Sequence, residues 1–246
     1  MKLISFLQFL LAQSAASFSI PLQALLSPLA SPAKETYPSR IPTVEESAAM
    51  ARRMLRLESI GTLSTVYPSS YYRSDVAGSP LGLVDYFADC EPTTGNPTLL
   101  GMRISSSYSN AAAGSNMTLS IQWHPPTSPT SRPYSTMEMP RFAVIGTVER
   151  MELGIVDRVK ITQCYAKYHP DSVVWMPGNQ IHESYWMRLV VTEVYWLGGF
   201  GSRAYIGWIP LETWKAVTEE DIEKTRLPGE EEEKSLWNRW FGSLEL

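Results

Sequence analysis

The sequence is poor in the side chains that most often bind metals. Its 246 residues include three histidines, His124, His169 and His182, and two cysteines, Cys90 and Cys164. No two of them have the sequence spacing that is typical of zinc ligands. We therefore predict no metal site.

An excess of charge of one sign is also missing. The chain has 21 Lys and Arg residues against 25 Asp and Glu residues, which gives a formal net charge of −4. Proteins that bind nucleic acids neutralise phosphates with a basic face, and this balance does not favour one. We expect no nucleic-acid partner.

The short motifs that carry catalytic chemistry are absent as well. The sequence contains no G-x-S-x-G, H-E-x-x-H, P-loop or G-x-G-x-x-G pattern. His182-Glu183 and His169-Pro170-Asp171 place a base beside a carboxylate, but adjacent residues of a strand point to opposite faces. Neither cysteine has a nearby histidine that would activate its thiol. The sequence therefore assigns no catalytic residue.

Long hydrophobic runs are missing too, because no segment has the roughly 20 apolar residues of a membrane-spanning helix. A shorter apolar run at residues 3–12 follows Lys2 and precedes small residues at 14–17. This order of charged, apolar and cleavable regions is typical of a secretory signal peptide. We predict a signal over residues 1–18, no membrane span, and a protein that is secreted or enters the lumen of a lysosome or vacuole.

Composition divides the remainder into three parts. Residues 19–42 are rich in Pro, Ser and Ala and form a linker or pro-segment, and residues 43–217 hold the predicted domain. Residues 218–246 form an acidic tail whose last part, 236–241, is aromatic. The tail is either a docking helix for a partner or an extension that packs loosely or stays disordered.

Periodicity predicts a mostly β domain with two flanking helices. Thr43 and Glu46 have the spacing of a capping box, which begins a helix over residues 44–57, and apolar residues predict a second helix over 161–168. Alternating apolar and polar residues predict a strand over 117–123. Six further strands are predicted at 61–66, 81–88, 97–104, 142–148, 187–197 and 204–209. About seven strands separated by turn-forming residues indicate a barrel or a sandwich.

Two features agree with a secretory route. Asn116-Met117-Thr118 is the only Asn-x-Ser/Thr triplet without Pro in the middle, so Asn116 is the predicted glycosylation site. Cys90 and Cys164 either form one disulfide or remain two buried thiols, and the sequence leaves both alternatives open.

The order of several motifs resembles the CREG family of secreted "cellular repressor" glycoproteins. The resemblance extends over about residues 44–201. It implies a six-stranded split β-barrel and a homodimer. The motifs that carry it are the helix at 48–57 before Gly61-Thr62-Leu63-Ser64-Thr65, then Gly78-Ser79-Pro80-Leu81-Gly82, Ser107-Tyr108-Ser109-Asn110 before Asn116, Arg141-Phe142-Ala143-Val144-Ile145-Gly146-Thr147-Val148, Tyr168-His169-Pro170-Asp171 before Trp175, and the strand at 187–197 before Gly198-Gly199.

The same resemblance bears on cofactors, because this family belongs to the flavin-binding split-barrel group that includes pyridoxamine phosphate oxidases. Flavin binders of the group carry a cation near the segment that corresponds to residues 105–110, whereas this chain has no Lys or Arg there. The resemblance to CREG proteins also implies that flavin binding has been lost. If FMN binds, the candidate residues are Arg103, Ser105, Ser107 and Asn110.

The resemblance favours a secreted, non-enzymatic glycoprotein that acts by binding a protein or glycan-receptor partner. An FMN-dependent oxidoreductase is the alternative. A third hypothesis, a haem-handling protein, requires His169 or His182 to lie in the dimer cleft.

Overall fold

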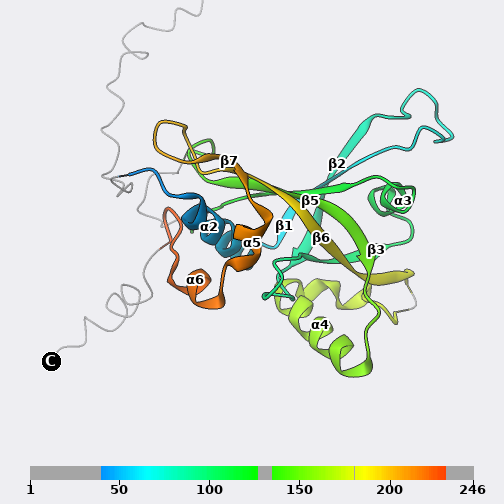
Figure 1. Cartoon of the computed structure of the whole chain (residues 1–246). Coiled ribbons are helices and arrows are strands. Elements are labelled where there is room, and N and C mark those ends of the chain that lie inside the picture. Colours follow the sequence, from blue (N-terminus) through cyan, green and yellow to red (C-terminus); the bar gives the residue numbers. More distant parts are fainter. Residues whose placement is uncertain (1–39, 127–134, 180, 231–246) are drawn as a thin grey trace, which may run out of the picture. The chain divides into compact units, whose positions relative to one another are not determined.

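The computed structural model describes residues 40–126, 135–179 and 181–230 (Figure 1). Seven strands form an antiparallel sheet in the order β3-β2-β1-β4-β5-β6-β7, and pairing of β3 with β6 closes six of them into a barrel. This confirms the predicted mostly β fold and the six-stranded split barrel. The strands are β1 (Ile60–Val66), β2 (Pro80–Ala88), β3 (Thr98–Met102), β4 (Met117–Gln122), β5 (Arg141–Arg150), β6 (Ser184–Leu197) and β7 (Ile206–Ile209).

Within the described residues, six short or medium helices flank the barrel. The two predicted helices are present, although the second begins six residues earlier than expected, at Ile155. The others were not predicted, because each has too few residues to show a helical period. The helices are α2 (Val44–Leu57), α3 (Ser106–Ala112), α4 (Ile155–Tyr168), the 3₁₀ helix η1 (Pro170–Val174), α5 (Leu211–Ala216) and α6 (Glu219–Lys224).

The main core fills the barrel and extends to α2. The side chains of Leu63, Leu119, Val144 and Val194 point inward and are fully buried. Helix α2 begins with the predicted capping box, in which Thr43 Oγ1 accepts a hydrogen bond from the Glu46 amide at 3.2 Å and Glu46 Oε2 accepts one from the Thr43 amide at 2.8 Å. The buried face of α2 packs against the barrel core through Ala48, Ala51, Met54 and Leu55.

A second, smaller core lies between α4 and the outside of the barrel. Ala88 and Leu100 point away from the barrel, because Phe87 and Leu99 beside them belong to the main core. Tyr165 of α4 packs edge-on against Trp186, with ring centroids 5.1 Å apart. Helix α4 is therefore a layer on β2, β3 and β6 (Figure 1).

The loop between β2 and β3 connects several of these layers. Cys90 forms a disulfide with Cys164 of α4, with Cα atoms 5.8 Å apart. Glu91 pairs with Arg188 of β6, and the Pro92 carbonyl accepts a hydrogen bond from the guanidinium of Arg52 in α2. The loop thus joins α2, α4 and the barrel wall.

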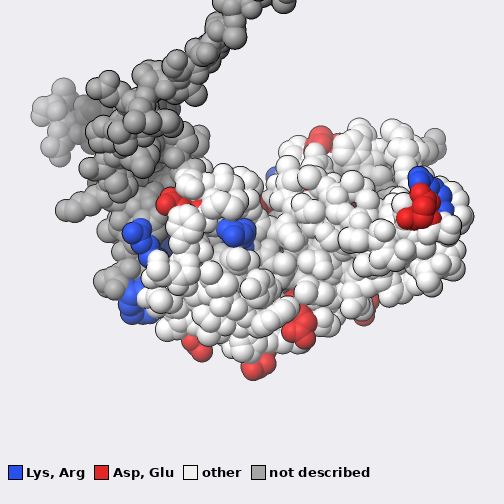
Figure 2. Space-filling view, turned by 90° about the horizontal axis from the view of Figure 1, so that it is seen from above, with Lys and Arg blue, Asp and Glu red and all other residues white. Residues whose placement is uncertain are grey.

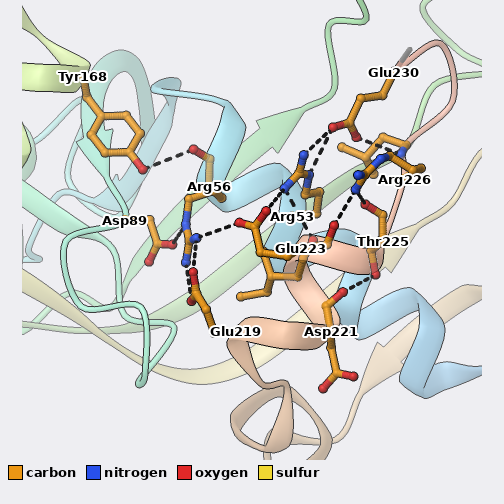
Figure 3. A network of polar contacts seen from close by, with 12 residues as sticks. Arg53, Arg56, Asp89, Tyr168, Glu219, Asp221, Glu223, Thr225, Arg226 and Glu230 are labelled. Carbon is orange, nitrogen blue, oxygen red and sulfur yellow. Dashed lines mark hydrogen bonds and ion pairs between the residues drawn. The ribbon is translucent and has the colours of Figure 1, made fainter. Parts of the chain in front are cut away.

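Part of the segment assigned to the acidic tail packs on the domain (Figure 3). Arg56 donates to Asp89 Oδ2 at 2.7 Å and to both carboxylate oxygens of Glu219, at 2.6 and 3.0 Å. Arg53 pairs with Glu230, and Ile222 and Leu227 are buried. The expectation of a loose or disordered extension is therefore wrong for residues 218–230, while residues 231–246 lie outside the described residues.

The signal region 1–18 and most of the linker at 19–42 also lie outside the described residues. In the part of the chain that the structure describes, no helix combines the length and the apolar character needed to cross a membrane.

A bulge in β6 depends on a glycine in β5. The register between these strands shifts after Ile145, so that Gly146 pairs with Val191 and Thr192 is left over. Asn96 Oδ1 accepts a hydrogen bond from the Val191 amide at 3.0 Å. A Cβ atom at Gly146 would lie 1.9 Å from the carbonyl oxygen of Val190, so no larger residue fits without moving the strands.

We predict that Gly146→Ala lowers the free energy of unfolding by about 3 kcal/mol or more, because backbone must move to relieve the clash. Gly201→Ala is the matched control, since its Cβ would meet only the Ile206 side chain, at 3.4 Å. Urea unfolding followed by tryptophan fluorescence measures both variants. Equal midpoints for the two variants would contradict the assigned register.

Candidate functional site

The segment after β3 contains all four candidate flavin contacts. Arg103 was predicted to lie on a strand, but β3 ends at Met102 and Arg103 begins a turn. Its guanidinium donates to Glu183 Oε2 at 2.8 Å, and its side chain is 75% exposed. A hydrogen bond from Tyr185 and the pairing with Arg103 lower the pKa of Glu183. Arg103 therefore already has a carboxylate partner at the surface.

The other three candidates belong to α3, which the sequence analysis had not predicted. Ser105 precedes the helix, and its carbonyl oxygen accepts a hydrogen bond from the Ser109 hydroxyl at 3.0 Å. Ser107 and Asn110 face the interior, with only 2% of each residue exposed. The Asn110 amide donates to the buried hydroxyl of Thr65 in β1 at 3.1 Å. These side chains attach α3 to the barrel.

The four residues do not fit a flavin phosphate. A phosphate dianion is held firmly where several charge-assisted donors converge on it. Here two candidates are turned into the protein and the one cation of the set pairs with Glu183. The structure therefore does not bring the four candidates together as a phosphate site.

Two polar residues in this region, the partly buried Asp85 and the buried Tyr108, were not singled out from the sequence. Burial raises the pKa of Asp85 in β2, although the Tyr86 amide donates to its Oδ1 at 2.8 Å and acts in the opposite direction. The hydroxyl of Tyr108 in α3 is buried without a hydrogen-bond partner among the described residues. Burial, and secondly the charge of Asp85, raises the pKa of Tyr108 well above its ordinary value. The available signal was a single carboxylate in the apolar run at 81–88.

His169 is a structural residue in the α4 layer. It is 3% exposed, and its ring stacks on Tyr86 with centroids 4.0 Å apart. Its Nε2 lies 2.9 Å from the carbonyl oxygen of Phe87 and donates to it, and burial lowers the pKa of the imidazole. Asp171 accepts a hydrogen bond from the Tyr86 hydroxyl at 2.9 Å. A histidine held in this way is not available to ligate haem iron, whereas His182 is exposed.

The described residues contain no group of three or more His, Cys, Asp or Glu side chains placed to hold a metal ion. The structure therefore offers no additional metal-binding candidate within those ranges.

The outer face of the sheet has the character of a surface that binds another molecule. A row of cross-strand neighbours runs over six strands and carries no charged side chain. Its centre consists of small residues, while Val84 at one end is 72% exposed and Tyr195 and Trp208 at the other end pack edge-on with centroids 4.9 Å apart. Figure 2, viewed from above Figure 1, shows few charged side chains over the middle of that side of the molecule. The row is Val84, Thr62, Ser120, Ala143, Tyr195 and Trp208.

The predicted glycosylation residue lies beside this face. Asn116 is exposed and directly precedes β4, in which Thr118 and Ser120 point outward and Met117 and Leu119 point into the core. An oligosaccharide attached to Asn116 would therefore extend into solvent and would not disturb the core.

Comparison with known proteins places this geometry in a family. The description "CREG, beta-barrel" matches residues 42–216, while no sequence among the curated proteins matches the chain. The fold is similar to that of a heme binding protein from Mycobacterium smegmatis, with a TM-score of 0.53, 18% identity, and coverage of 71% of this chain and 61% of that protein. This chain therefore spans about three fifths of the length of that protein.

Two further solved structures are more distant. A FAD-binding protein from Mesorhizobium loti has a TM-score of 0.41 and 15% identity, over 60% of this chain and 91% of that protein. The heme storage protein HutZ from Vibrio cholerae has a TM-score of 0.44 and 14% identity, over 63% of this chain and 94% of that protein. Because the family match covers all of the barrel and α2, this chain belongs to the CREG β-barrel family.

Proposed function

We propose that this chain is a secreted, non-enzymatic glycoprotein that acts by binding a protein or glycan-receptor partner and has no tight flavin site. The observation that carries the proposal is the placement of the flavin candidates, because Ser107 and Asn110 are buried and Arg103 pairs with Glu183. What remains accessible is a broad sheet face without charge in its central row. Such a face suits contact with another macromolecule more than chemistry on a small substrate.

A homodimer is part of this proposal. The small side chains of Ser120, Thr62 and Ala143 let another flat surface approach closely, and an isologous contact would also cover the exposed parts of Val84 and Trp208. The family resemblance supports the same oligomeric state.

A secretory route is supported by three independent features: the apolar run at 3–12, the exposed Asn116, and the disulfide between Cys90 and Cys164. Structural disulfides persist mainly in oxidising compartments.

The absence of a tight flavin site follows from the strength of phosphate contacts. The loss of two charge-assisted phosphate contacts, each contributing about 1.5 to 3 kcal/mol, is enough to move a nanomolar flavin site toward the micromolar range.

The first test is a titration with FMN. We expect purified protein to show no flavin absorbance and to bind added FMN with a Kd of about 1 µM or weaker, since hydroxyl donors alone hold a phosphate poorly. Submicromolar binding that Arg103→Ala weakens would instead support the oxidoreductase alternative.

A titration with haemin tests the third hypothesis, that of a haem-handling protein. A Soret band that disappears in His182→Ala would assign haem binding to that exposed histidine.

The second test concerns the dimer. We expect ultracentrifugation at micromolar concentration to give about twice the monomer mass, and Ser120→Arg to shift the protein to monomer because it places a large charge at the centre of the outer face. Gln163→Arg is the matched control, since it adds the same charge at an exposed position of α4. A wild-type monomer, or equal effects of the two variants, would contradict the assigned face.

The third test addresses secretion and glycosylation. Expression of the full chain in a eukaryotic secretory host should release a protein that lacks the signal at 1–18 and loses mass on treatment with an N-glycosidase. Thr118→Ala should abolish that mass change, because it removes the acceptor triplet, whereas Ser120→Ala on the same strand should not. Retention inside the cell with Met1 in place would overturn the secretory assignment.

A further inference from the structure

The edge of β2 that faces β3 is open over most of its length. The two strands pair only at the last two residues of β2, Phe87 and Ala88. From Pro80 to Tyr86, β2 therefore has β1 as its only strand neighbour among the described residues. An unpaired strand edge presents free N–H and C=O groups to which another extended chain can bind.

The hydrogen bonds between β1 and β2 show which backbone groups remain free. The Phe87 amide donates to the carbonyl oxygen of Ser59 at 2.9 Å, in register with the β1–β2 pairing. Hydrogen-bonded pairs alternate along an antiparallel ladder, so the odd-numbered residues of β2 bond to β1. The amides and carbonyls of Gly82 and Val84 therefore point toward the open edge.

The side chains beside these groups are apolar and accessible. Leu83 is 50% exposed and Val84 is 72% exposed, on opposite faces of the strand. Gly82 is also exposed, and its lack of a side chain leaves the backbone accessible. Apolar surface beside a free edge is covered best by a strand that brings apolar side chains of its own.

Asp85 indicates the charge of the segment that fits this edge. It is the one charged residue of β2, and its Oδ1 accepts a hydrogen bond from the Tyr86 amide at 2.8 Å. This amide also belongs to the open edge, so the carboxylate takes the place that a carbonyl of an added strand would have. Within the described ranges, no Lys, Arg or His pairs with Asp85. A basic side chain of an added strand would supply the missing counter-charge.

We propose that the open edge of β2 binds an extended segment of a partner protein as an added strand, with a Lys or Arg of that segment paired to Asp85. The backbone groups of Gly82 and Val84 hold the segment, and the side chains of Leu83 and Val84 contact its apolar residues. A glycan lacks the regular N–H and C=O groups of an extended chain, so this edge selects a protein. The inference rests on the partner-binding function proposed above and narrows the class of partner.

The test uses the full chain as purified and a phage-displayed library of random dodecapeptides as the probe. We expect the enriched peptides to have apolar residues at alternate positions and at least one Lys or Arg. Val84→Pro should weaken the binding of a selected peptide by about tenfold or more, because it removes an amide donor from the open edge but no bond to β1. Val84→Ala is the matched control, since it shortens the same side chain and keeps the amide.

Two further variants separate the charge and the location of the site. Asp85→Asn should weaken binding of the selected peptide, and this difference should vanish when the basic residue of the peptide is replaced by Gln. Ser120→Arg, on the outer face, should leave the peptide affinity unchanged. A failure of strand addition is therefore distinguishable from a failure of the outer-face contact, which Ser120→Arg tests through the oligomeric state.

N-methylation of alternate amides of the peptide covers the case in which Val84→Pro impairs folding, because it removes the same hydrogen bonds while the protein is unchanged. The absence of any enriched peptide overturns the proposal, as do equal affinities of Val84→Pro and Val84→Ala for the peptide. Protection of amides 82 and 84 from hydrogen exchange without peptide, if it is lost on dilution, overturns the proposal in favour of a second copy of the chain.

Discussion

The buried guanidinium of Arg52 is the constraint around which the domain is arranged. Arg52 is fully buried, donates to the carbonyl oxygens of Pro92 and of Trp214 in α5, the latter at 3.2 Å, and lies 5.2 Å from the centre of the Trp214 ring. No described carboxylate forms an ion pair with it, and burial lowers its pKa. A cation taken out of water is tolerated only where fixed dipoles replace its hydration. Arg52 thus holds α2, the β2–β3 loop and α5 in one arrangement, and Gly95 is required there because a Cβ would lie 2.8 Å from its Nη1.

The same loop transmits this constraint to the barrel wall. At the bulge in β6, Asn96 Oδ1 accepts a hydrogen bond from the Val191 amide, and Glu91 forms an ion pair with Arg188 of the same strand. The disulfide adds α4, whose core on the outside of the barrel is separate from the main one. Closing a loop between residues 74 positions apart reduces the conformational freedom of the unfolded chain and favours the folded state by roughly 4 kcal/mol in the chain-entropy account. Two hydrophobic cores therefore behave as one domain because a polar loop lies between them.

Much of this fold was accessible from sequence, and the failures have physical causes. The helix at 44–57 was predictable because a capping box and an apolar stripe agree locally, and the strands because alternation is strong wherever one face is buried. Helix α3 was not, since its seven residues are held by tertiary contacts such as Asn110 to Thr65 rather than by a period. Arg103 was assigned to a strand because apolar Ile104 follows it, yet Ile104 is 74% exposed. The pairing of Cys90 with Cys164 depends on a Cα distance, which no linear pattern contains.

A glycan on Asn116 would also limit how a flat partner can approach. Asn116 lies four residues before Ser120, about 13 Å along an extended strand, and the two share the outward parity of β4. A branched sugar at that point would be bulkier than the side chains of the outer row and would stand at its margin. Two such faces could then form a dimer only in orientations that leave both sugars outside the interface. Glycosylation would select the direction of assembly by exclusion, and an unmodified chain would have more ways to associate.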